Sequence, residues 1–106
     1  MAIIRYTTPT VRFMFSEIDI DDISVAYLTI KQNNNTVIEK DINSAVITNT
    51  ETEQSVAWKL TQDDTLKLAK NVNALIYCDW KLTDGTRGRS HVRAEGVEDT
   101  GMQEVI

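Results

Sequence analysis

The residues that could support nucleophilic catalysis are few, because the chain contains one histidine, His91, and one cysteine, Cys78. A serine or cysteine nucleophile needs a histidine beside it and an acidic group that orients the ring. Period-two alternation predicts His91 on the outward side of one strand and Cys78 on the inward side of another, between Ile76 and Trp80. A buried cysteine behaves as a small hydrophobic residue. We therefore expect no catalytic residues and no enzymatic activity.

Carboxylates gather at two places in the sequence. The stretch Glu17–Asp22 holds four of them among isoleucines, and calcium is bound by several oxygens of this kind. The stretch lacks the glycine and the distal glutamate of an EF-hand loop, so a solvated acidic loop is favoured and weak calcium binding stays open. Asp63 and Asp64 follow Thr61, which predicts a helix N-cap that stabilises an acid. We expect no metal site and no cofactor.

The large aromatic residues could build a sugar-binding platform or a protein contact. Trp58 and Trp80 fall on the apolar side of their predicted strands, which places them in the core. Tyr27 and Tyr77 fall on the other side of theirs, which makes them candidates for a protein-binding surface. A carbohydrate-binding sandwich module is the alternative, and it requires an exposed aromatic platform.

Four basic or titratable residues recur at every second position near the end of the chain: Arg87, Arg89, His91 and Arg93. On a single strand this spacing places all four side chains on one face. One interpretation is a docking strip for an acidic partner, including the Glu17–Asp22 loop of a neighbouring copy. The other, which is favoured, is a charged edge strand that discourages unwanted pairing.

Seven segments are predicted as strands or short strand-like segments, and the longer ones alternate between apolar and polar residues, which is typical of strands with one buried face. They cover residues 11–15, 25–32, 36–40, 45–48, 55–60, 72–82 and 87–97. Asn33–Asn35 and Thr83–Thr86 predict hairpin turns, and Thr61 predicts the start of a helix over 62–69. This pattern predicts an all-β domain, a two-sheet sandwich of about seven strands with one short helical turn. A closed barrel is the less favoured alternative.

Length and composition indicate one domain over residues 1–106, with the segments 1–8 and 98–106 as arms that could stay flexible. The net charge of −5 argues against nucleic acid as a partner. No apolar run approaches the roughly 20 residues that span a bilayer, so we expect no membrane contact. The single cysteine and the absence of a secretion signal favour folding in a cytoplasm.

The second half of the chain resembles a known family through three segments: Trp58–Leu66, Val72–Trp80 and Thr83–Arg87. In order they are a strand that ends in leucine, a capped helical turn, a long strand and a Thr-Asp-Gly hairpin. This organisation is similar to the N-terminal immunoglobulin-like domain of phage upper-baseplate, receptor-binding-complex proteins. One departure is Lys70-Asn71, where a glycine is expected after the helix.

The resemblance implies an immunoglobulin-like sandwich with no catalytic residues. It also implies a structural role in a phage or prophage tail, baseplate or neck, exercised through protein–protein contacts. The partners would be other virion proteins or copies of the chain itself, in a homo-oligomeric assembly. Such a protein is made in the cytoplasm of the bacterial host and ends in the virion.

Overall fold

The computed structural model describes residues 3–16 and 18–99 of the chain. Its strands are β1 (Ile3–Ile4), β2 (Thr10–Met14), β3 (Ile23–Gln32), β4 (Asn35–Asp41), β5 (Val46–Asn49), β6 (Gln54–Lys59), β7 (Ala74–Leu82), β8 (Arg87–Arg89), β9 (Arg93–Glu95) and β10 (Val97–Glu98). The helix α1 spans Gln62–Leu66, and two 3-10 turns, η1 and η2, span Ile20–Asp22 and Ile42–Ser44.

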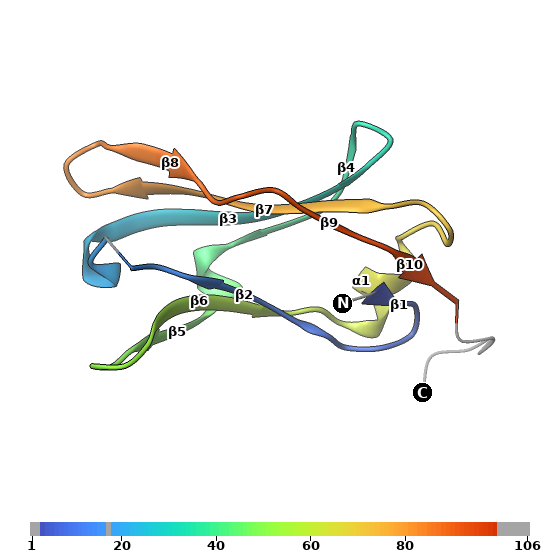
Figure 1. Ribbon diagram of the computed structural model, residues 1–106, viewed down its shortest axis with the longest axis horizontal. Helices are drawn as coiled ribbons and strands as arrows, with labels where there is room; N and C mark the ends of the chain where they lie inside the picture. Colours follow the sequence, from blue (N-terminus) through green and yellow to red (C-terminus); the bar gives the residue numbers. More distant parts are fainter. Residues whose placement is uncertain (1–2, 17, 100–106) are drawn as a thin grey trace.

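Two antiparallel sheets face each other and enclose the core (Figure 1). One sheet has the order β2-β6-β5. The other has the order β4-β3-β7, and β8 and β9 both pair with β7. The predicted all-β sandwich with one short helix is confirmed.

The order of the strands matches that of an immunoglobulin sandwich. Such a sandwich has strands A, B, E and D in one sheet and C, F and G in the other, and some members add a strand C′ beside C. With β2 as strand B, the sheet β2-β6-β5 has the order B-E-D, and the sheet β4-β3-β7-β8 has the order C′-C-F-G. The predicted immunoglobulin-like arrangement of the two sheets is therefore confirmed.

The inward side chains of both sheets form one core. Trp58 of β6 is fully buried, and the ring of Phe13 meets it edge-on with the ring centroids 6.0 Å apart. The Trp58 indole N–H donates to the carbonyl of Asp41 at 2.8 Å, which satisfies the one polar atom of that side chain. The opposite sheet contributes Ala26, Leu28, Ile30, Ile76 and Cys78. The predicted inward positions of β3, β6 and β7 are confirmed for these residues.

The helix cap predicted at Thr61 is present. The Thr61 hydroxyl accepts from the Asp64 N–H at 3.1 Å, and the Asp64 carboxylate accepts from the Thr61 N–H at 2.8 Å. The helix ends at Leu66, earlier than the predicted end at Ala69. The buried Gln32 side chain accepts from the Ala69 N–H at 2.8 Å and donates to the Ala69 carbonyl at 2.9 Å. These bonds replace helical partners, so the chain turns toward β7.

Residues near the N-terminus are held by the last strand. β1 pairs with β10 in parallel, and Ile3 is fully buried. Arg5 donates its N–H to the carbonyl of Glu98 at 2.9 Å and forms an ion pair with Asp99 at 3.1 Å. Residues 3–5 of the first predicted arm and residues 98–99 of the second are therefore bonded to each other. Residues 1–2 and 100–106 of the two arms lie outside the described residues.

The predicted last strand, 87–97, is broken into three. β8 pairs Arg89 with Asp79, but β9 pairs Arg93 with Ile76, so the register shifts by one residue between them. At the break the Ser90 hydroxyl accepts from the Cys78 N–H at 2.9 Å, in place of a backbone partner. An extra residue of this kind is a β-bulge, and it reverses the faces of the side chains that follow.

Candidate functional site

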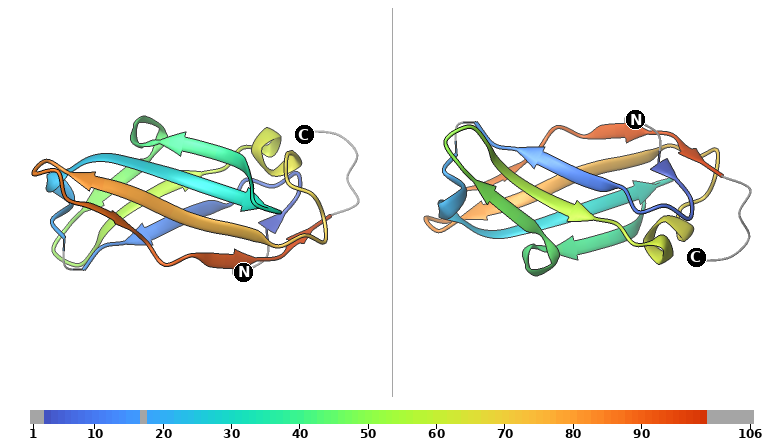
Figure 2. Two further views of the ribbon diagram at one scale, coloured as in Figure 1. Left: turned by 90° about the horizontal axis from the view of Figure 1, so that it is seen from above. Right: turned by 90° about the horizontal axis from the view of Figure 1, so that it is seen from below.

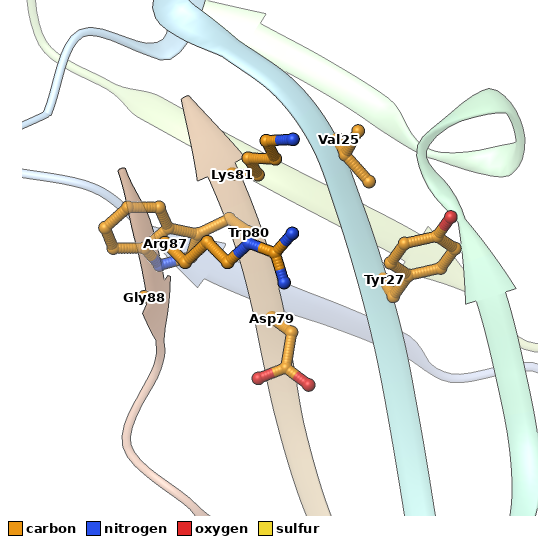
Figure 3. Close-up of a pocket in the computed structure, with 7 residues that line it drawn as sticks. All are labelled: Val25, Tyr27, Asp79, Trp80, Lys81, Arg87 and Gly88. Carbon is orange, nitrogen blue, oxygen red and sulfur yellow. The ribbon is translucent and has the colours of Figure 1, made fainter. Parts of the chain in front are cut away.

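A groove of about 450 Å³ lies on the sheet of β3, β7 and β8. Its lining comprises Val25, Tyr27, Asp79, Trp80, Lys81, Arg87 and Gly88. Figure 3 shows Val25 and Tyr27 on β3, with the other residues on β7 and β8. Two of the residues predicted for a binding surface, Tyr27 and Arg87, thus line one groove.

The outward positions of the three strands supply most of the lining. Tyr27 lies beside Asp79 in the β3–β7 register, and Lys81 lies beside Arg87 in the β7–β8 register, so these side chains share the outer face. Tyr27 is 42% exposed, a large value for a tyrosine in a central strand. Arg87 extends from β8 back across β7 (Figure 3). The result is an exposed phenol between two carboxylates, Asp79 on β7 and Asp41 on β4, with the cations Lys81 and Arg87 beyond Asp79.

Trp80 reaches the groove from the inner face. Its register partners are Ala26 and Gly88, and its indole extends toward β8 (Figure 3). Phe15 meets the ring edge-on at a centroid distance of 6.4 Å. A methyl group on Gly88 would overlap the six-membered ring of Trp80, so the missing side chain makes the space for it. The prediction that Trp80 lies in the core holds in part, since the ring is half-buried and also lines the groove.

Arg89 and Tyr77 form a fixed pair next to the groove. Arg89 donates from Nε and from its terminal nitrogen to the two Asp79 oxygens, at 2.6 and 3.2 Å. Its guanidinium lies 4.3 Å from the centre of the Tyr77 ring, and Lys31 stands 5.9 Å from the same ring. The hydrogen bond to Asp79 raises the pKa of Arg89 above its ordinary value. Tyr77 faces outward as predicted, yet it is 6% exposed because these cations cover it.

The predicted basic ladder of Arg87, Arg89, His91 and Arg93 does not form on one face. Arg87 and Arg89 face outward, but the bulge turns Arg93 inward. The Arg93 guanidinium lies 4.7 Å above the Phe13 ring and donates to the carbonyl of Arg12 at 3.1 Å. His91 lies exposed in the bulge between β8 and β9. Arg93 therefore closes one side of the sandwich, and neither residue lines the groove.

Two other candidate residues, Cys78 and Asp19, do not line the groove. Cys78 is buried in the core, and burial, followed by the nearby Asp79 charge, raises the pKa of its thiol to about 12. Asp19 accepts from the Asp21 N–H at 3.0 Å and caps η1, while Glu17 lies outside the described residues. Within residues 3–16 and 18–99 no group of three or more His, Cys, Asp or Glu side chains converges as a metal site would require.

Sequence reasoning missed the part that Gly88 plays in the groove. A single glycine inside a predicted strand signals a close approach by a neighbouring side chain, and that signal is present at Gly88. The contribution of Trp80 follows from it, because the ring occupies the space over the glycine. Asp79 also carried a signal, as a carboxylate that directly follows the apolar run Ala74–Cys78.

No protein-family model matches the sequence, and no curated protein matches it significantly. Within the described residues, the structure contains no helix that combines the length and the apolar character needed to cross a membrane.

Proposed function

We propose that the chain is a non-enzymatic structural domain that binds an acidic surface of another protein. The binding face would be the groove of β3, β7 and β8, with Tyr27 and Arg87 as its main contacts. The observation that carries this proposal is that groove, which gathers an exposed tyrosine, a half-buried tryptophan and two cations on one face.

The charge around the groove supports an acidic partner. The whole chain has a net charge of −5, whereas the groove lining holds two cations, Lys81 and Arg87, and one carboxylate, Asp79, which is paired with Arg89. Since Arg89 already occupies that carboxylate, Lys81 and Arg87 remain to meet a negative group. Tyrosine and arginine are also the residue types that contribute most to protein-binding energy.

The resemblance of Trp58–Leu66 and Thr83–Arg87 to a phage baseplate domain suggests which proteins to test. We place the partner among the virion proteins of a phage or prophage tail, baseplate or neck. In such an assembly a small groove would suffice, because repeated copies add their weak contacts together.

Co-expression with the proteins encoded beside the gene tests the proposal. A tagged chain should retain one of them, and Arg87→Glu should lower that affinity at least about tenfold through like-charge repulsion. Lys59→Glu is the matched control, since it makes the same charge change at an exposed site on the other sheet. Binding that survives Arg87→Glu unchanged, or the failure of every neighbouring protein to bind, would contradict the proposal.

A carbohydrate ligand is the second candidate, favoured by the half-buried Trp80 beside the exposed Tyr27. Trp58 cannot take part, because it is fully buried. A sugar that stacks on Trp80 would shift its emission, while Trp58 would not respond. Titration with an oligosaccharide panel decides between the candidates, and Arg87→Glu should matter less for a neutral sugar than for an acidic protein.

A further inference from the structure

A second surface of the molecule lies at the free edge of β5, on the sheet opposite the groove. β5 ends the order β2-β6-β5 and pairs on one side with β6. The view from below shows this sheet with β2 (blue) at one edge and β5 (green) at the other (Figure 2). Val46 and Ile47 are 66% and 49% exposed, although they are large β-branched residues in a strand. An apolar free edge of this kind is a template for pairing with another strand.

The segment around β5 carries no protection against such pairing. No charged residue and no proline occurs between Asp41 and Glu51. The register of β5 with β6 is also continuous, without a bulge. Charges, prolines and bulges are the usual devices that keep a free edge from pairing.

The other edge strands are protected by such devices. β2 carries Arg12, and β4 carries Glu39 and Lys40. β8 and β9 carry arginines and are separated by the bulge at Ser90. The run around β5, 42–50, has nine uncharged residues. The next longest runs have eight, at 23–30 and 71–78, and they lie mainly in the central strands β3 and β7. β5 thus has the sequence of a strand that is paired on both sides.

The backbone of β5 offers two residues to a new strand. The Thr50 N–H donates to the Glu53 carbonyl at 2.8 Å and closes the β5–β6 hairpin. In an antiparallel ladder the direction of the backbone groups alternates from residue to residue. Thr48 and Val46 therefore face β6 like Thr50, and Ile47 and Asn49 direct their N–H and C=O groups outward.

We propose that β5 pairs with β5 of a second copy of the chain, antiparallel and about a two-fold axis. With the axis at Thr48, Ile47 of each copy lies opposite Asn49 of the other, and both outward pairs of N–H and C=O groups are satisfied. The two three-stranded sheets then join into one. The contact is isologous, so it closes at two copies.

The register of β5 favours a second copy as the occupant, because the two outward residues lie on either side of Thr48 and match each other across a two-fold axis. Two chains of net charge −5 repel each other, and this repulsion is weakest where neither presents a charge. The segment 42–50 is such a place. A partner recruited by charge would instead use the groove at Arg87, which lies on the other sheet. This inference goes beyond the proposed function and does not depend on it.

Sedimentation of the full chain over a concentration series up to the millimolar range tests the proposal. The weight-average mass of the wild type should rise from one chain toward two. Ile47→Lys should weaken association at least about tenfold, because the axis brings two lysines near each other at a formerly neutral contact. Met14→Lys is the matched control, since it adds the same charge to a 61% exposed site on β2, at the far edge of the same sheet.

A second variant and a measurement at single residues distinguish the loss of the dimer from the loss of the fold. Asn49→Pro removes an outward N–H and leaves the ladder to β6 intact, so it should also abolish the dimer while the circular dichroism stays native. In the wild type, amide exchange at Ile47 and Asn49 should slow as concentration rises, with no change over Thr10–Met14.

Two outcomes would overturn the proposal. One is a wild type that stays monomeric at every concentration. The same conclusion follows if the β5 amides of a monomer become protected only when a different protein is added. The other is a dimer that persists in both Ile47→Lys and Asn49→Pro. Arg87→Glu should dimerise like the wild type, which separates this result from the test of the groove.

Discussion

The two tryptophans lie in opposite sheets and have different roles. Both lie on the inner face of a strand, Trp58 on β6 and Trp80 on β7. Trp58 is fully buried against Phe13, and its N–H is bonded to the Asp41 carbonyl. Trp80 is half-buried and lines the groove beside Gly88. The same inward orientation therefore gives a core residue in one sheet and a residue of the candidate binding groove in the other.

The neighbours across the strands explain the difference. The β2 partner of Trp58 is Val11, and Phe13 follows on the same face, so apolar side chains cover the indole. The β8 partner of Trp80 is Gly88, which has no side chain and lies next to the short edge of the sheet. We attribute the partial exposure of Trp80 to the glycine opposite it, which has no side chain to cover the ring.

The largest expected effect follows the loss of the buried ring. Trp58→Ala should lower the free energy of unfolding by about 3–5 kcal/mol, because it opens a cavity in the core. Trp80→Ala should cost clearly less, since part of its ring already contacts solvent. Urea denaturation of both variants measures the two values. Equal losses would mean that Trp80 belongs to the core as fully as Trp58 does.

The second effect comes from filling the space over Trp80. Gly88→Ala should destabilise the fold by about 1–3 kcal/mol, because the added methyl group overpacks the site. It should also displace the indole and change its emission. Gly96→Ala is the control, since nothing lies within 4 Å of a methyl group at that position and it should have little effect. A Gly88→Ala variant with native stability and emission would show that Trp80 does not depend on the glycine.

The third effect concerns the ion pair of Lys40 with Asp64, which lies next to the hydrogen bond of Trp58. Lys40 lies 2.9 Å from Asp64, and the next residue, Asp41, accepts from the Trp58 indole. Burial alone would raise the pKa of Asp64, but the Thr61 N–H, followed by Lys40, holds it below the ordinary value of 3.8. Asp64→Ala should cost about 0.5–2 kcal/mol at neutral pH, the range for a lost helix cap.

The pH dependence of that loss has a definite sign. Since the pKa of Asp64 is lowered on folding, its contribution is present above 3.8 and disappears as the pH falls through the folded-state value. The difference between wild type and Asp64→Ala should therefore shrink between pH 5 and pH 2, a window of about 3 units around the ordinary aspartate pKa. Denaturation at each pH measures it, with Asp63→Ala as the neighbouring control. A constant difference would contradict the assignment to the ionised carboxylate.

Much of the fold could be predicted from alternation and turn residues. The sequence from Thr10 to Leu82 marks its strands by period two, and Asn33 and Asn34 do adopt the positive φ angles of 52° and 64° that a tight hairpin requires. The cap at Thr61 depends on neighbours within one helical turn, so it was also predictable. Features set by contacts within a few residues are those that sequence alone indicates.

The bulge between β8 and β9 could not be predicted in this way. No glycine or proline marks it, and it is stabilised by the Ser90 hydroxyl, which takes a bond from Cys78 of another strand. Because a bulge exchanges the two faces, it separates Arg93 from Arg87 and invalidates the predicted ladder. The burial of Tyr77 likewise depends on Arg89, which reaches it from the neighbouring strand.

The most direct test of the binding face is amide mapping of the labelled chain in complex with the partner protein that the co-expression test identifies. We predict shifts concentrated at Tyr27, Asp79, Lys81 and Arg87, the residues around the groove. The amides of Trp58 and its core neighbours should stay unchanged. Shifts confined to other surfaces, with the groove residues unaffected in the complex, would contradict the assignment of the groove as the binding face.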